Sequence, residues 1–405
     1  TPRTPATTKF DIITYDTETI LDILMPELYL ADSTRIALNI DQNDSLSLNI
    51  SSDRIALGQN SLKAFDLNLS NSDSLLLSNI STDVITVGKG NLYDNTVGIL
   101  SKDGVVSLFC KLDNDTNNSN ELLLSSSISF DRGVSGGIRT NIFLDSSFVN
   151  IRGYRLNIDS SYASVAKREF SFRDFIIHNE GQSLTIDGTL SENPEDSIHV
   201  YFDKFDISLA DAFLKKKIGI EGELTGNILA TGIYGTPNIL MDVNGSGIAL
   251  KSRTVGNLHI MSKWDQNRSR MNLLLQNNNE GLNPLTLSGY YQPSGKFLNM
   301  NVALKEFGLS AIEPFLNGAL INTGGVISGD LVLMGTMNRL TLNSNNTRIH
   351  NFAFTPAYTN VPYVASGDVT FDQSGIYFEA LKVHDKFNNE ATISGSLRHN
   401  YFRNM

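Results

Sequence analysis

The apolar residues of this chain recur at every second position over many short segments. In one of them, Leu46, Leu48 and Ile50 alternate with serine and asparagine. Alternation of this kind predicts half-buried antiparallel strands with one apolar and one wetted face. The same pattern returns in many segments separated by turn residues, among them 65–70, 106–112, 184–190 and 368–381.

The number of these segments predicts a very large sheet. At about 11 residues for a strand and its turn, 405 residues allow roughly 30 strands, and an open sheet beyond about 10 to 15 strands curls, splits or stacks. The sequence therefore predicts an all-β fold, an elongated and curled antiparallel or mixed sheet that forms a groove (a β-taco or a solenoid-like form). A few short helices are expected beside it.

A unit of about 100 residues occurs twice. The segment FDKFDISLADAFL at 202–214 is echoed by LKEFGLSAIEPFL at 304–316, and strand-like segments flank both copies at similar offsets. A third copy begins at 391–397. We expect a diverged β-repeat region over residues 1–165 and a clearer repeat region, with a period of 102 residues, over residues 166–405.

The echoed segment is the one predicted helix of each unit. Ser208 with Asp211, and Ser310 with Glu313, have the spacing of a capping box, in which the serine and the carboxylate each satisfy a free backbone N–H. Pro314 falls near the end of the first turn, where a proline removes at most one intrahelical bond. A short helix lying on the sheet face is expected in both copies.

Glycines in the repeat predict bends in the sheet. Gly226 aligns with Gly329, and Gly232 aligns with Gly335, inside segments that otherwise read as strands. Glycine within a strand marks a bulge, a bend or a close backbone approach.

The composition excludes several functions. The net charge is −11 and the largest basic cluster is three lysines at 215–217, so the chain is a poor nucleic-acid binder. The six histidines lie apart, the aspartates from Asp113 onward break the calcium-loop pattern, and we expect no metal and no cofactor. No convergent set of acid, base and nucleophile occurs, so an enzyme is not expected. The single cysteine, Cys110, lies in an apolar strand and is expected to be a buried, inert thiol.

The repeat at 201–248 and its echo at 321–343 resemble the TamB family of translocation and assembly proteins, relatives of the AsmA-like envelope proteins. In that family a short segment with a Leu/Phe pair is followed by a Gly-x-Leu-x-Gly strand, a second strand ending in glycine, and another strand. The resemblance covers about residues 170 to 405. It implies a β-taco lined with apolar side chains, anchored in the inner membrane and lying in the periplasm, that moves phospholipids toward the outer membrane or assists outer-membrane protein assembly. Phospholipid acyl chains are the implied ligand, and an outer-membrane barrel protein is a further partner through regions outside this sequence.

The repeat-paired apolar residues are the predicted groove lining. An ordinary packed core is the alternative, and a chaperone-like module or a cell-surface glycan-binding solenoid are the competing functions. The predicted lining residues are Phe205, Leu209, Phe213, Leu214, Leu224, Ile228, Phe307, Leu309, Phe315, Leu316, Ile327 and Leu331.

Overall fold

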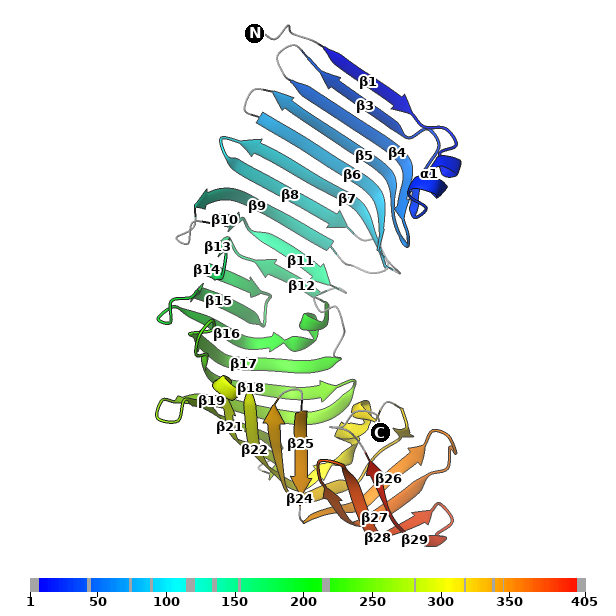
Figure 1. The fold of residues 1–405 in the computed structure, drawn as a ribbon, viewed down its shortest axis with the longest axis vertical. Helices are drawn as coiled ribbons and strands as arrows, with labels where there is room; N and C mark the ends of the chain where they lie inside the picture. The colour runs from blue at the N-terminus through cyan, green and yellow to red at the C-terminus, as the bar shows by residue number, and fades with distance from the viewer. Residues whose placement is uncertain are drawn as a thin grey trace. The chain divides into compact units, whose positions relative to one another are not determined.

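The protein is all-β. A computed structural model describes residues 7–41, 45–72, 75–87, 90–113, 121–132, 137–151, 154–212, 219–279, 282–316, 318–336, 339–344 and 346–398. In these residues 29 strands belong to a single sheet, and every described pairing is antiparallel (Figure 1). The predicted all-β sheet is therefore confirmed, and it is antiparallel rather than mixed where its pairings are described.

The chain divides into two compact units. The first comprises Thr1–Gly181 with Thr185–Thr189, and the second comprises Gln182–Leu184 with Leu190–Met405. The strands of the first unit, including β15 at the division, are β1 (Thr8–Ile13), β2 (Leu28–Leu30), β3 (Arg35–Ile40), β4 (Leu46–Leu57), β5 (Asn60–Ser72), β6 (Leu75–Val87), β7 (Gly90–Lys102), β8 (Val105–Asp113), β9 (Glu121–Arg132), β10 (Ile138–Leu144), β11 (Ser147–Ile151), β12 (Tyr154–Ile158), β13 (Ser161–Ala166), β14 (Glu169–His178) and β15 (Ser183–Leu190).

The second unit carries the repeat. Its strands are β16 (Ser197–Asp206), β17 (Ile220–Thr231), β18 (Asn238–Leu250), β19 (Arg253–Asp265), β20 (Arg270–Asn279), β21 (Leu282–Gln292), β22 (Phe297–Gly308), β23 (Leu320–Ile321), β24 (Val326–Thr336), β25 (Arg339–Ser344), β26 (Thr347–Pro356), β27 (Tyr363–Phe371), β28 (Gly375–Asp385) and β29 (Glu390–Arg398). The succession β16, η1, β17 in the first copy corresponds to β22, η3, β24 in the second, so a repeated strand architecture underlies the sequence repeat.

The helical elements are short. They are α1 (Glu18–Leu24) in the first unit and the 3-10 helices η1 (Ile207–Ala212), η2 (Pro293–Gly295) and η3 (Leu309–Phe315) in the second. The predicted helices at 202–214 and 304–316 thus exist as single 3-10 segments at the ends of β16 and β22.

The capping box predicted for the second copy is wrong. The residue that caps η3 is Gly308, and no side chain caps the helix. The carboxylate of Glu313 instead accepts hydrogen bonds from the backbone N–H (2.7 Å) and the hydroxyl (2.8 Å) of Thr323, and pairs with Arg253. The Glu313 carboxylate therefore bonds to residues distant in the sequence, and not to a backbone N–H at the start of the helix as the capping-box spacing predicted.

A β-bulge recurs at the same place in both copies. The register shifts between Phe202 and Phe205 and again between Leu304 and Phe307. The extra residues Lys204 (φ 47°) and Glu306 (φ 53°) are both left-handed, and a bulge of this kind bends the strand that carries it.

The strand facing each bulge supplies a hydroxyl to it. The backbone N–H of Lys204 donates to Thr225 Oγ1 (3.1 Å), and that of Glu306 donates to Ser328 Oγ (2.9 Å). A glycine with positive φ follows the hydroxyl residue in both strands: Gly226 at 140° and Gly329 at 139°. The bulge lies in the strand that faces each glycine, and the bend predicted at the glycines themselves stays a prediction.

Two more bulges, at Asn351 and Ala380, have a similar arrangement, and the left-handed Asp174 makes the same kind of hydrogen bond. In each, a left-handed residue donates its N–H to a serine or aspartate that directly precedes a glycine in the next strand. The donor, acceptor and glycine are Asp174, Asp187 and Gly188; Asn351, Ser366 and Gly367; and Ala380, Ser394 and Gly395. A Ser/Thr/Asp-Gly pair therefore recurs beside several of these left-handed residues, although Ser288-Gly289 lies in regular pairing on both sides.

Candidate functional site

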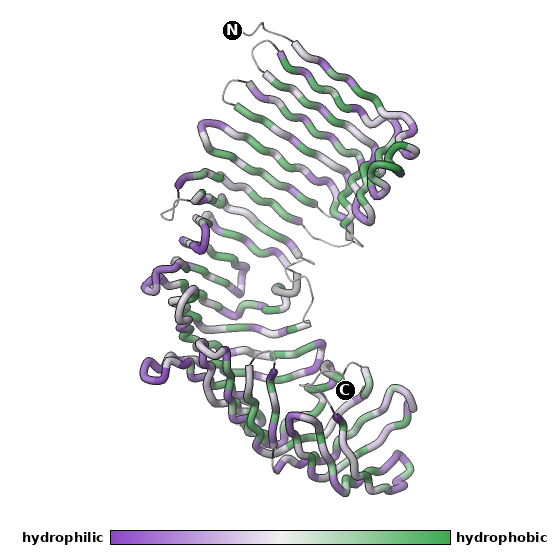
Figure 2. Tube along the Cα trace, viewed as in Figure 1, coloured by the Kyte–Doolittle hydropathy of each residue, from purple (hydrophilic) through white to green (hydrophobic). Residues whose placement is uncertain are grey.

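One face of the first unit carries an unbroken apolar row. Directly paired residues of β1, β3, β4, β5, β6, β7, β8 and β9 form it, and because paired residues in antiparallel strands point to the same side, all of them lie on one face. Figure 2 shows the apolar and polar positions alternating along these strands. The row comprises Ile12, Ile36, Ile50, Leu67, Ile80, Val97, Cys110 and Leu124.

This apolar face is open to solvent. Ile12 is exposed and the other seven members of the row are half-buried, and none is fully buried. In the described part of the first unit the only fully buried apolar residues are Leu156 and three alanines, Ala31, Ala56 and Ala163. Leu, Ile and Val side chains remain half-exposed on a sheet face that no second layer covers.

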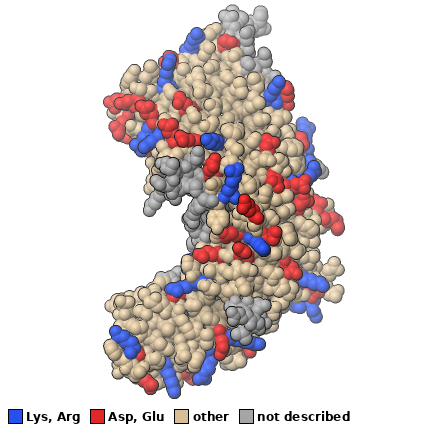
Figure 3. Space-filling model, turned by 180° about the vertical axis from the view of Figure 1, so that it is seen from behind, with Lys and Arg blue, Asp and Glu red and all other residues tan. Residues whose placement is uncertain are grey.

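The accessible surface of the chain agrees with this exposure. It amounts to 24866 Å² for 44.5 kDa. Two separate compact proteins, each of half this mass, would together expose about 18,800 Å². In Figure 3 most of the visible surface is tan, the colour of residues other than Lys, Arg, Asp and Glu. The excess area is consistent with sheet faces that the chain itself does not cover.

Cys110 differs from its prediction. It lies in a strand as expected, but it is only half-buried within the apolar row. Burial raises the pKa of the Cys110 thiol above its ordinary value, which fits its apolar neighbours Val97 and Leu124. The alternating pattern identified the strand, but it could not show that this face is left uncovered.

The second unit has rows of paired residues on one face that are mostly apolar but include Gly226, Ser262 and Gly289. One row runs from Val200 on β16 through Ile228 to Leu342 on β25, and the adjacent row runs from Phe202 through Val243 to Leu331. Here some members are fully buried, with Val243 at 3% and Leu331 at 4% exposed. This face is therefore more covered than the face of the first unit.

The structure brings the strand residues of the predicted groove onto this one face. Phe205 lies opposite Leu224, and Phe307 lies opposite Ile327, so each pair shares a side. Residues an even number apart on a regular strand also share a side, which adds two more members. The six strand residues on the face are Phe205, Leu224, Ile228, Phe307, Ile327 and Leu331.

The remaining predicted residues belong to the 3-10 segments. Leu209 and Leu309 are buried, and Leu316 is half-buried. Phe213 and Leu214 lie outside the described residues, as does the side chain of Phe315. Whether any of the twelve residues contacts a ligand stays a prediction.

Part of the predicted groove lining belongs to a packed core. Leu309 and Ile327 are members of a buried cluster that includes Ile349, Ala365 and Val369, and Phe307 packs against it. For these residues the packed-core alternative has direct structural support. Leu224 and Ile228 are half-buried and do not belong to this cluster.

Glu313 fixes the 3-10 segment of the second copy. Its carboxylate joins η3 to Arg253 on β19 and to Thr323. Partial burial works to raise the pKa of Glu313, but the hydrogen bonds from Thr323 and the Arg253 guanidinium together hold that pKa below its usual value. The network anchors the segment whose Leu309 belongs to the buried cluster, and sequence spacing gave no sign of it.

Comparison with family models, with curated proteins and with solved structures gives no match for this chain. The TamB resemblance therefore stays an expectation drawn from the repeat. Among the residues that the structure describes, no helix has the length and apolar character needed to span a bilayer.

Proposed function

We propose that this chain is a scaffold that binds phospholipid acyl chains on its apolar sheet faces. The lipids would move across the sheet, from each strand to the strand paired with it. The observation that carries the proposal is the eight-strand row from Ile12 to Leu124, whose side chains are apolar yet half-exposed. Exposed apolar surface of this extent marks a site for an apolar partner.

The dimensions of the row suit an acyl chain. Eight strands at about 4.8 Å spacing extend about 34 Å, whereas the tails of one leaflet span about 15 Å, half of a hydrocarbon core about 30 Å thick. Each CH₂ group removed from water contributes about 0.8 kcal/mol. A lipid can therefore bind firmly while its head group stays in water.

Repetition across the strands favours movement over fixed binding. Leu38, Leu48 and Leu69 form part of a second apolar row beside the first, so neighbouring sites offer nearly the same surface. Steps between sites of equal free energy need no chemistry, and the mechanism uses no catalytic residue. The periplasmic location, the inner-membrane anchor and a barrel partner rest on the TamB resemblance alone.

Lipid extraction from gently purified protein, followed by mass spectrometry, tests the proposal. We expect phospholipid in the wild type and in a Leu77→Ser variant, but much less in an Ile80→Ser variant. Ile80 lies in the row, whereas Leu77, which is 44% exposed, projects from the opposite face of the same strand. Lipid-free wild-type protein, or equal loss in both variants, would argue against the proposal.

A second candidate function is the binding of unfolded β-strands by strand addition. All nine residues of β29 are exposed, and its one described pairing is with β28. A sheet edge with unpaired N–H and C=O groups can accept an added strand. Crosslinking from Ser396 to the strands of an unfolded outer-membrane protein would favour this role.

A further inference from the structure

A polar pocket lies on the other face of the first unit. Ile142 on β10 lies opposite Ile128 on β9, on the apolar side. Because side chains alternate along a strand, Arg139 and Asn141 project from the opposite face. Asn141 lies across from Ser164 on β13, which continues this polar face.

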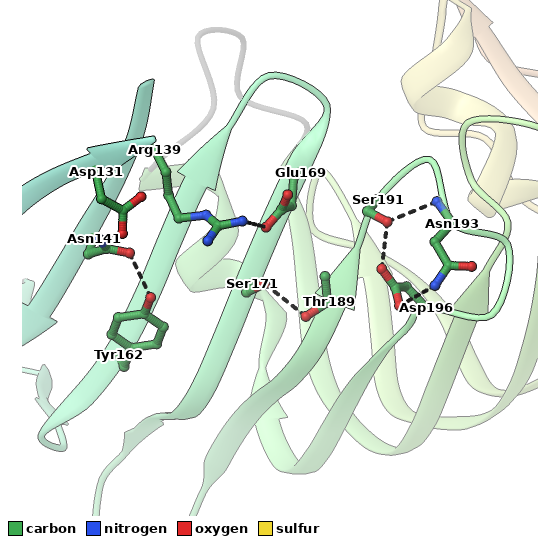
Figure 4. Close-up of polar contacts among 10 residues, drawn as sticks. All are labelled: Asp131, Arg139, Asn141, Tyr162, Glu169, Ser171, Thr189, Ser191, Asn193 and Asp196. Atoms are coloured by element: carbon green, nitrogen blue, oxygen red, sulfur yellow. Dashed lines mark hydrogen bonds and ion pairs between the residues drawn. The ribbon is translucent and has the colours of Figure 1, made fainter. Parts of the chain in front are cut away.

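The pocket has a volume of about 350 Å³ and is formed by β10, β13, β14 and β15. Arg139 Nη2 donates to Glu169 Oε1 at 2.8 Å, as Figure 4 shows. Both side chains are largely enclosed, at 23% and 22% exposed. Arg139 Nε is buried and has no hydrogen-bond partner in the described part of the chain.

Hydroxyl groups line another part of the pocket. Ser171 and Thr189 share a hydrogen bond of 2.8 Å, and Tyr162 donates its hydroxyl to Asn141 Oδ1 at 2.7 Å (Figure 4). The Tyr162 oxygen can still accept a hydrogen bond. The wall therefore presents donors and acceptors side by side.

The charges of the pocket favour a neutral ligand. Two cations, Arg139 and Arg173, and two carboxylates, Glu169 and Asp187, line the pocket. An anion would meet the carboxylates and a cation would meet the guanidinium groups. A hydroxyl group both donates and accepts, so it can bond to a guanidinium N–H and to a carboxylate oxygen of the pocket wall together. Adjacent hydroxyls on one ring repeat that pattern.

We propose that this pocket binds a neutral saccharide. Its volume falls at the small end of ligand pockets, which suits a short segment of a chain rather than a long one. The site is independent of the apolar face, since it lies on the other side of the sheet and uses different residues.

A glycan array probed with the full chain tests the proposal, followed by calorimetric titration of the neutral oligosaccharides that bind. We expect binding by the wild type, about tenfold weaker binding by Ser171→Ala, and loss of binding in Arg139→Lys, which lacks the planar guanidinium group and its forked N–H donors. Ser107→Ala is the matched control, and the affinity of this variant should not change. Ser107 lies between Val106 and Leu108 in β8, so its side chain projects from the polar face, outside the pocket.

Three outcomes would overturn the proposal. One is an array on which the wild type binds no neutral glycan. Another is unchanged affinity in Ser171→Ala and Arg139→Lys variants that circular dichroism shows to be folded. The third is displacement of the bound oligosaccharide by inorganic phosphate or acetate, which would identify the pocket as an anion site. An unfolded Arg139→Lys variant leaves the decision to Ser171→Ala.

Discussion

Gly226 and Gly329, 103 residues apart, adopt the same left-handed backbone, with φ values of 140° and 139°. Each faces a bulge in a paired strand, and each follows the residue whose hydroxyl accepts the N–H of that bulge. Both copies of the repeat therefore contain the same backbone arrangement: a bulge, a hydroxyl that accepts its N–H, and a glycine of positive φ.

Alanine at either glycine should destabilise the protein. A Cβ at Gly226 would lie 2.1 Å from the Asp242 carbonyl oxygen, and one at Gly329 would lie 2.6 Å from that of Asn346. With the strain of a positive φ, we expect a loss of about 1–3 kcal/mol in unfolding free energy, measured by urea denaturation. Gly181→Ala is the control, because a Cβ there meets nothing within 4 Å. Equal stability of all three variants would contradict the role of the bulge.

Removal of the hydroxyl beside a bulge should cost less. Ser328→Ala leaves the Glu306 N–H without its acceptor. Because that N–H is exposed and water can replace the serine, the expected loss is about 0.5–1.5 kcal/mol. A loss as large as that of Gly329→Ala would mean that Ser328 does more than accept this bond.

The Glu313 network should make stability depend on pH. The pKa of Glu313 is lower in the folded chain than in the unfolded one, so its contribution is present above the unfolded value and is lost as pH falls through the folded value. Glu313→Gln should therefore lower the unfolding free energy at pH 7, by about 1–3 kcal/mol, and the difference from wild type should shrink below about pH 4. A difference that stays constant down to pH 3 would contradict this assignment.

Two leucines of the predicted groove should respond differently to truncation. Leu331 is 4% exposed, so Leu331→Ala leaves a cavity and should cost about 2–5 kcal/mol. Leu224 is half-buried, and Leu224→Ala should cost less than half as much. Thermal unfolding of the two variants measures this. Equal losses would mean that Leu224 is as enclosed as Leu331.

The sequence predicted the strands because alternation is a local property. Leu46, Leu48 and Ile50 face one way in β4 as expected, and the 3-10 segments lie where the repeat placed them. The partner of Glu313 was not predictable, because Arg253 lies 60 residues away and only the folded sheet brings the two together.

The apolar row of the first unit was not predictable for a related reason. Each member is visible as one residue of an alternating run, but the alignment of Ile50 with Leu67 and Ile80 depends on the register between strands. Turn lengths and bulges fix that register. The list of groove residues therefore followed the repeat in 166–405 and omitted the more exposed face in 1–165.

The pKa of Cys110 gives an independent measure of how apolar the row is. Since burial raises that pKa, the thiolate fraction near neutral pH should be smaller than in a free cysteine peptide. Maleimide labelling should be correspondingly slower, with its rate rising to an inflection at higher pH than in the peptide. An inflection at or below that of the peptide would contradict an apolar surrounding.

The most direct test of lipid binding on the apolar face is protection of Cys110 from maleimide by phosphatidylcholine with short acyl chains, added as monomers. The account predicts that labelling slows in proportion to the lipid added. In a Cys110→Ser chain carrying Leu77→Cys on the opposite face, the rate should not change. Equal labelling of Cys110 with and without lipid, or equal protection at both positions, would contradict the binding of acyl chains to this face.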